Sequence, residues 1–146
     1  MKVIIIFVLG VMMSASSFAA DTGPAAPAAV DKEMQTARAQ ISKKDWTAAV
    51  ATLEPYTKTN AKSADRFNLL GYSYRNLKRY DESLVAYKQA LTLDPNHKGA
   101  HEYIGIAYVQ MGQPAKAREH LAALDKICTF SCEEYRDLKR ALEAVK

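Results

Sequence analysis

Polar and apolar residues follow one another with a helical period over most of this chain. Apolar or aromatic side chains recur three and four positions apart, as at Phe67, Leu70 and Tyr74, and this spacing places them on one face of a helix. The periodic runs stop at residues 94–96 and 112–114, where Asp, Asn, Gly and Pro gather. The pattern therefore predicts an all-α chain of short helices joined by tight turns.

A 34-residue period underlies these helices. When residues 64–97 are aligned with residues 98–131, Leu70-Gly71 falls on Ile104-Gly105, and the same frame extends back to residues 30–63. A glycine within a helix is destabilising by about 1 kcal/mol relative to alanine. Its recurrence at one position of the repeat predicts that two neighbouring helices approach each other closely there.

The repeat resembles the tetratricopeptide repeat family. Residues 64–97 carry nearly the whole family pattern, at Phe67, Leu70, Gly71, Tyr74, Tyr80, Ser83, Tyr87, Ala90 and Pro95. The third repeat has Thr129 where the family has proline, and the first is degenerate in its opening helix. The resemblance implies an α-solenoid of three helix-turn-helix repeats, at about residues 30–63, 64–97 and 98–131, in a domain covering residues 31–146.

A further helix is expected after the third repeat. Ser131 and Glu134 have the spacing of a capping box, which favours a helix start at this point. Tyr135, Leu138 and Leu142 then recur on one face. Because each repeat buries its apolar face only against its neighbours, we expect a capping helix over residues 132–145 to cover the open end of the stack.

The first 19 residues have the features of a secretory signal peptide. Lys2 precedes an uninterrupted apolar run from Val3 to Met13, and small residues stand at −3 and −1 of a cleavage site after Ala19. This run is shorter than the roughly 20 residues that span a bilayer. A flexible Ala- and Pro-rich tether is expected at residues 20–30. The expected product is periplasmic or secreted, without stable membrane insertion; an uncleaved anchor is the alternative.

Charge and motif content narrow the class of function. The formal net charge is +4, but Lys and Arg alternate with Asp and Glu along the chain, which does not indicate a nucleic-acid-binding surface. No phosphate-binding, dinucleotide-binding, serine-hydrolase or zinc-protease motif occurs. His97 and His101 are interpreted as turn and packing residues, and His120 as a surface residue. The sequence therefore predicts no enzyme, no cofactor and no metal site.

Cys128 and Cys132, the two cysteines, lie at the expected junction of the third repeat and the last helix. In an exported protein this pair predicts a structural disulfide. A redox function, or Cu(I) handling in an assembly factor, remains an alternative. The spacing is not that of a thioredoxin motif, and no Met or His stands beside the pair.

The resemblance also implies where a partner binds. In the tetratricopeptide repeat family, ligands lie in a concave groove lined by the first helix of each repeat. The corresponding stripe here supplies Met34, Arg38, Asn68, Tyr72, Arg75, Glu102, Tyr103 and Ile106. Some family members clamp the C-terminal carboxylate of a peptide with lysines, but here Glu102 stands where another cation would be expected.

These residues favour an exported scaffold that binds a protein or an extended peptide of mixed polar and apolar character. Tyr and Arg, which the stripe contains, are enriched among the residues that dominate binding energy. An accessory subunit of a cell-envelope machine is a second alternative, in which the convex face or the capping helix would be the interface.

Overall fold

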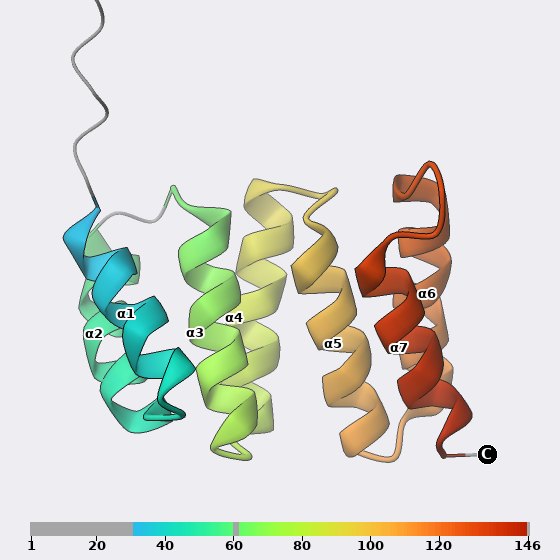
Figure 1. The fold of residues 1–146 in the computed structure, drawn as a ribbon, viewed down its shortest axis with the longest axis horizontal. Helices are drawn as coiled ribbons and strands as arrows, with labels where there is room; N and C mark the ends of the chain where they lie inside the picture. Colours follow the sequence, from blue (N-terminus) through green and yellow to red (C-terminus); the bar gives the residue numbers. More distant parts are fainter. Residues whose placement is uncertain (1–30, 60–61, 146) are drawn as a thin grey trace, which may run out of the picture. The chain divides into compact units, whose positions relative to one another are not determined.

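The computed structural model describes residues 31–59 and 62–145. Over these ranges the chain forms seven α-helices and no strand (Figure 1). Their bounds are α1 Lys32–Ser42, α2 Trp46–Thr59, α3 Ala64–Asn76, α4 Tyr80–Leu93, α5 Lys98–Gln110, α6 Pro114–Ile127 and α7 Glu133–Glu143. The predicted all-α helical-repeat class is confirmed. The expected signal peptide and tether lie outside the described residues.

Helices that follow one another in the chain pack side by side. α1 packs on α2, α3 on α4 and α5 on α6, and the second helix of a pair also contacts the first helix of the next pair (Figure 1). α7 packs against both α5 and α6 and so covers the end of the third helix pair. None of the helices in the described ranges is long and apolar enough to cross a membrane.

The 34-residue period is visible in the backbone of the turns within the three pairs. Lys44, Lys78 and Gly112 have positive φ angles of 59°, 60° and 70°. In each turn the N–H of the next residue donates to a carbonyl oxygen five positions before it, as Arg79 does to Tyr74 at 2.9 Å. This bond satisfies a carbonyl at the end of the first helix, and the left-handed residue redirects the chain into the second.

Two apolar clusters form the core of the helical domain. The first joins α1 to α4 and includes Leu53 and Leu70. The second joins α4 to α7 and includes Tyr87, Leu124 and Leu138. Residues of α3 and α4 belong to both clusters, since Leu70 and Ala86 lie in the first and Tyr72 and Tyr87 in the second.

Gly71 and Gly105 create the room that large side chains fill. A Cβ at Gly71 would lie 2.6 Å from the Tyr87 ring, and a Cβ at Gly105 would collide with Leu138 of α7. Ser83 donates from Oγ to the Gly71 carbonyl oxygen at 2.9 Å. The expected close approach is present, but a neighbouring side chain, and not a second backbone, occupies the space over each glycine.

Gly71→Ala is expected to lower the free energy of unfolding by about 2 kcal/mol. The added methyl group collides with the Tyr87 ring, which is fully buried. We expect this collision to outweigh the gain of about 1 kcal/mol in helix propensity. Urea denaturation followed by circular dichroism measures the difference. An unchanged or increased stability would mean that the Tyr87 ring moves aside without loss.

The start of α7 differs from the sequence prediction. Cys132 is the N-cap residue and makes no side-chain cap hydrogen bond. Ser131 has a φ of 28°, and its carbonyl oxygen accepts a hydrogen bond from the Arg136 guanidinium. The predicted capping box of Ser131 and Glu134 is therefore wrong. A disulfide ties Cys132 to the end of α6, so the residue after Ser131 takes the cap position.

Candidate partner-binding surface

Three aromatic side chains form a row across neighbouring helices. Trp46 at the start of α2 lies 5.6 Å from Tyr72 of α3, measured between ring centroids, and Tyr72 lies 4.9 Å from Tyr103 of α5. All three side chains are partly exposed. Tyr103 also contacts the buried Tyr87 ring, with centroids 6.1 Å apart. The aromatic row, as we call Trp46, Tyr72 and Tyr103, is thus fixed to the core and preformed.

Arg75 places a cation against two of these rings. Its guanidinium carbon lies 5.1 Å from the Tyr72 centroid and 5.6 Å from the Tyr103 centroid. The guanidinium also donates to Oε1 of Gln110 at 3.4 Å. Its Nε is buried and has no hydrogen-bond partner among the described residues. The structure therefore brings Tyr72, Arg75 and Tyr103 together, where cation–π attraction orients the guanidinium.

Asn68 and Glu102 are buried, which corrects their assignment as open groove residues. Their exposed fractions are 8% and 9%. Asn68 lies beside Gly99 at the start of α5, and its Oδ1 has no partner in the described part of the chain. Glu102 faces α7, whose packing against α5 the helical spacing alone does not reveal. Neither side chain is a freely accessible contact.

Glu102 has an unusual electrostatic environment. Burial raises the pKa of its carboxyl to about 7, and the nearby carboxylates of Asp137, Glu134 and Glu133 contribute to this rise. Arg75 acts in the opposite direction and lowers the pKa. Desolvation and like charges both disfavour the ionised form, so Glu102 opposes folding when it is charged.

Glu102 is expected to destabilise the domain as the pH rises from 5 to 8, while the lowered pKa of His120 acts in the opposite direction and is the same in wild type and in a Glu102 variant. The folded pKa of Glu102 is above the unfolded value, so its stabilising contribution is complete at low pH and is lost as the pH rises through 7. Wild type should lose about 2 kcal/mol more over this range than Glu102→Gln, which cannot ionise. Urea unfolding at several pH values measures the loss. The same pH dependence in both proteins would contradict the assignment.

The remaining predicted groove residues make no ring or cation contact with this cluster among the described residues. Met34 is partly buried and packs on the first core cluster. Arg38 is exposed on α1. Ile106 is partly buried against the second core cluster. The ring and cation contacts around Tyr72 join α2, α3 and α5, and among the described contacts they include none of these three residues.

The sequence reasoning missed Trp46 and a cavity. Trp46 belongs to a second helix, so a search restricted to first helices excludes it. The cavity measures about 570 Å³ between α2, α3 and α4, away from the aromatic row, with a mainly apolar lining that includes Phe67, Leu70 and Val85. Val85 lines it while remaining 70% exposed. An exposed Val at a periodic position, such as Val85, does not by itself indicate a cavity, so the sequence could not predict this one.

The histidines form contacts between neighbouring elements. His101 and His120 approach each other through their Nδ1 atoms at 3.0 Å, which links α5 to α6. His120 is half-buried, and burial together with the nearby His101 lowers its pKa to about 4, so its assignment as a surface residue is wrong. His97 caps α5 and lies 3.0 Å from Asp65. Within the described ranges, no group of three or more His, Cys, Asp or Glu side chains is arranged to hold a metal ion.

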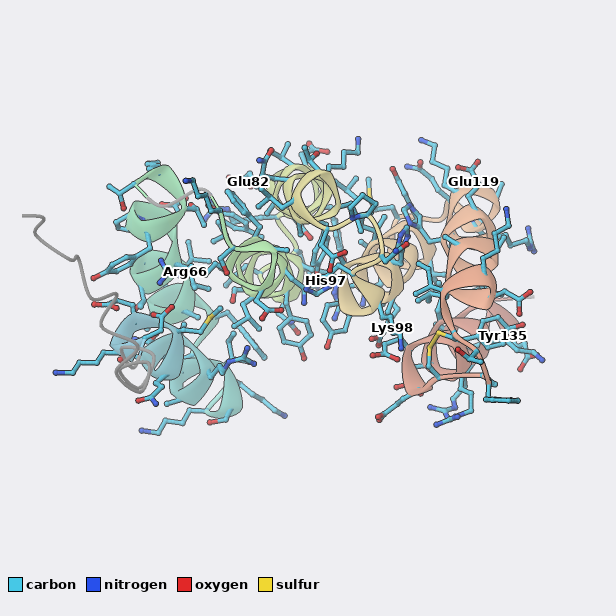
Figure 2. All side chains as sticks on the ribbon, turned by 90° about the horizontal axis from the view of Figure 1, so that it is seen from above. Arg66, Glu82, His97, Lys98, Glu119 and Tyr135 are labelled. Carbon is cyan, nitrogen blue, oxygen red and sulfur yellow. A yellow bond between two sulfur atoms is a disulfide. The ribbon has the colours of Figure 1, made fainter. Side chains whose placement is uncertain are left out.

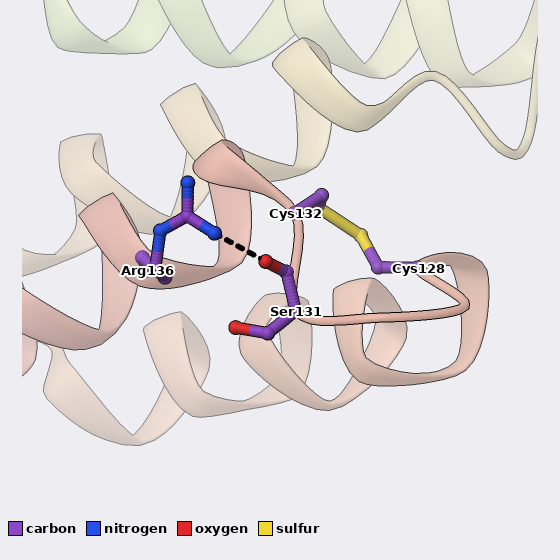
Figure 3. Close-up of a disulfide and its surroundings, with 4 residues drawn as sticks. All are labelled: Cys128, Ser131, Cys132 and Arg136. Atoms are coloured by element: carbon purple, nitrogen blue, oxygen red, sulfur yellow. Dashed lines mark hydrogen bonds between the residues drawn. A yellow bond between two sulfur atoms is a disulfide. The ribbon is translucent and has the colours of Figure 1, made fainter.

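The two cysteines are joined in a disulfide at the junction of α6 and α7 (Figure 3). Their Cα atoms lie 5.6 Å apart. Cys128 is buried, and Cys132 precedes the first residue of α7. Between them Phe130 is 90% exposed. The bond restricts the angle between α6 and α7, which is what a structural disulfide at this junction is expected to do.

Comparison with known proteins agrees with this architecture. Residues 64–97 match the family model described as tetratricopeptide repeat. These residues are α3, α4 and the turn that leads to α5. This chain contains a tetratricopeptide repeat. The match supports the reading of the helix pairs as tetratricopeptide repeats.

Three known proteins are similar to this chain over part or most of its length. The anaphase-promoting complex subunit cut9 of Schizosaccharomyces pombe is 36% identical over 74 residues, which are 51% of this chain and 11% of cut9. A solved structure of a MamA mutant is 27% identical, with a TM-score of 0.63 over 70% of this chain and 75% of that one. The TPR2B domain of yeast Sti1, in complex with pHsp70, is 19% identical, with a TM-score of 0.68 over 79% of this chain and 96% of that domain. The chain thus spans only about a tenth of the length of cut9.

Proposed function

We propose that this protein is an exported scaffold that binds a protein or peptide partner on the surface formed by the aromatic row and Arg75. The observation that carries the proposal is the meeting of Tyr72, Tyr103 and Arg75 on the first helices of two successive repeats, where all three remain partly exposed. Aromatic and Arg side chains held rigidly in this way lose little conformational entropy when a partner binds.

The shared fold supports a polypeptide ligand. The Sti1 domain, which has this fold at 19% identity, was solved in complex with pHsp70. The fold alone leaves the identity of the partner open, and this chain lacks the cations of a lysine-rich carboxylate clamp, since Glu102 occupies the relevant stripe. Its partner is therefore expected to differ from an acidic C-terminal peptide.

Affinity capture from cells that produce the protein tests the proposal. Wild type, Arg75→Ala and a control, Arg118→Ala, are compared by quantitative mass spectrometry. Arg118 is exposed on α6, away from the aromatic row. Proteins that wild type and the control enrich equally, and that Arg75→Ala loses, are partners held at the proposed surface. If Arg75→Ala enriches the same proteins as wild type, the surface is assigned incorrectly.

Export rests on the leader-like sequence of residues 1–19. The mature protein in the periplasm or medium is expected to begin near Ala20. Cell fractionation followed by intact-mass measurement tests this directly. A protein that retains Met1 and stays with the membrane fraction would instead be anchored by its leader.

The redox alternative predicts a different state of the cysteines. In a scaffold, Cys128 and Cys132 stay bonded, and thiol titration of denatured protein isolated from its own compartment should detect no free thiol. The buried position of Cys128 favours this result. Two free thiols per chain, or a stoichiometric Cu(I) complex, would favour an assembly factor. Crosslinking through α7 or the outer faces of the second helices would favour the accessory-subunit alternative.

A further inference from the structure

Two histidines on neighbouring helices face each other within the third helix pair. His101 of α5 and His120 of α6 approach each other through their Nδ1 atoms at 3.0 Å, and their ring centroids lie 5.3 Å apart. Both side chains are partly exposed, so the pair is not sealed within the core. We call His101 and His120 the imidazole pair.

The backbone fixes which nitrogen of His101 carries the hydrogen. Its Nε2 lies 3.0 Å from the carbonyl oxygen of Pro95. A carbonyl oxygen only accepts, so Nε2 is the donor, and Nδ1 of the neutral ring has a lone pair that points at His120. Histidines that bind metal ions usually donate their second ring N–H to a carbonyl or carboxylate, which fixes the orientation of the ring. His101 already has this arrangement.

His120 is held in place and is neutral at pH 7. Its ring stacks on that of Tyr108, with centroids 5.9 Å apart. Burial, and to a smaller extent the nearby His101 and Lys88, lowers its pKa to about 4, so a metal ion does not compete with a proton for this ring. Lys88 is exposed on α4, and solvent and salt therefore screen its repulsion of a metal ion.

The separation of the two nitrogens suits two neighbouring ligands of one metal ion. With metal–nitrogen distances of about 2.0–2.1 Å, the nitrogens lie about 2.9 Å apart at a right angle and about 3.3 Å apart at the tetrahedral angle. The separation here is 3.0 Å, close to the right angle. Square-planar or tetragonal geometry is typical of Cu(II) and Ni(II), and Cu(II) binds most tightly among the divalent first-row metals. In the metal-free protein the same separation accommodates a hydrogen bond from His120 to His101.

We propose that the imidazole pair binds a Cu(II) ion, with Nδ1 of His101 and Nδ1 of His120 as neighbouring ligands and water in the remaining positions. When the ion binds, the hydrogen on Nδ1 of His120 is transferred through solvent to Nε2 of the same ring. Both rings stay neutral, and both Nδ1 lone pairs coordinate the ion. The bound ion replaces the hydrogen bond between the rings and links α5 to α6.

This site is separate from the other features of the chain. It departs from the sequence-based prediction of no metal site, because the two histidines are 19 positions apart and only the packing of α5 on α6 brings them together. Cys128 and Cys132 are bonded to each other, so they supply no thiolate to the ion. The proposal does not depend on the partner-binding surface of Tyr72 and Arg75.

Titration of the purified protein with copper(II) sulfate in a non-coordinating buffer tests the proposal. The electron paramagnetic resonance spectrum of the bound Cu(II) should show hyperfine splitting from two imidazole nitrogens. His120→Phe keeps a ring against Tyr108 but has no nitrogen to coordinate the ion, and His101→Phe removes the other ligand. Each variant should bind Cu(II) at least tenfold more weakly than wild type, with circular dichroism to show that it is folded.

His97→Asn is the matched control. His97, labelled in Figure 2, caps α5 and lies 3.0 Å from Asp65. Asparagine is a favourable N-cap residue, so this change removes the remaining imidazole of the chain while a side-chain cap stays available. His97→Asn should bind Cu(II) as tightly as wild type.

Urea denaturation with and without Cu(II) provides a second readout. Because the ion binds the folded state, it should raise the urea midpoint of wild type and of His97→Asn, and leave that of His120→Phe unchanged. Equal Cu(II) affinity in wild type and both Phe variants overturns the proposal. A wild-type spectrum with fewer than two imidazole nitrogens overturns it as well, whether or not the variants fold. Zn(II) binding as tight as that of Cu(II) would contradict the assignment of the ion.

Discussion

Leu138→Ala is expected to lower the free energy of unfolding by about 3 kcal/mol. Leu138 is completely buried, and it fills the space left by Gly105 on the facing helix. Removing its isobutyl group leaves a cavity between α5 and α7 that the neighbouring helix cannot fill, since Gly105 has no side chain. The loss includes both the transfer energy of the deleted atoms and the cavity.

The control for this substitution lies on the same helix. Lys139 is exposed one residue further along α7, so Lys139→Ala should change stability by less than about 0.5 kcal/mol. Urea denaturation of both variants gives the comparison. A loss below 1 kcal/mol for Leu138→Ala would show that α7 contributes little to the fold and is not the cover of the last repeat.

A double variant that carries both Arg75→Ala and Tyr72→Ala is expected to bind the partner at least tenfold more weakly than wild type while the domain stays folded. Arg75 contacts both Tyr72 and Tyr103, so its removal eliminates the cation and frees two rings from their present orientation. Tyr72 also packs against the second core cluster. Some loss of stability is therefore expected for Tyr72→Ala, and circular dichroism must show that the variant is folded at the assay temperature.

A milder pair of variants separates packing from binding. Tyr72→Phe keeps the ring and removes only the hydroxyl, and Arg75→Lys keeps the charge but not the planar guanidinium. If the partner packs against the Tyr72 ring and the planar guanidinium of Arg75, Tyr72→Phe should bind the partner nearly as tightly as wild type, and Arg75→Lys should bind it more weakly. If both Arg75→Lys and Arg75→Ala bind the partner as tightly as wild type, Arg75 is not part of the binding surface.

The sequence predicted the helices because helical periodicity is a local property. The break predicted at residues 112–114 is the turn at Gly112, and the 34-residue register relates it to the left-handed turns at Lys44 and Lys78, which the sequence did not mark. Ser63 and Pro114 stand at the helix starts where their side-chain chemistry suggests. In each case, interactions within a few residues decide the backbone.

The sequence-based assignments that proved wrong depend on contacts between different helices. Helical spacing placed Asn68 and Glu102 on an accessible stripe, but α7 and the start of α5 cover them. The predicted cap at Ser131 failed because the disulfide joins the adjacent residue to another helix. His120 was assigned to the surface because its neighbour His101 is distant in sequence. None of these relations can be derived from one helix at a time.

The central claim is that a partner lies on the aromatic row, and site-specific photo-crosslinking in cells tests it most directly. The photo-reactive residue p-benzoylphenylalanine is placed at position 110, where exposed Gln110 contacts Arg75, and separately at position 118 on α6. Irradiation should give a discrete adduct with the captured partner from position 110, and Arg75→Ala should abolish it. Adducts with that partner from position 118 alone would contradict the account.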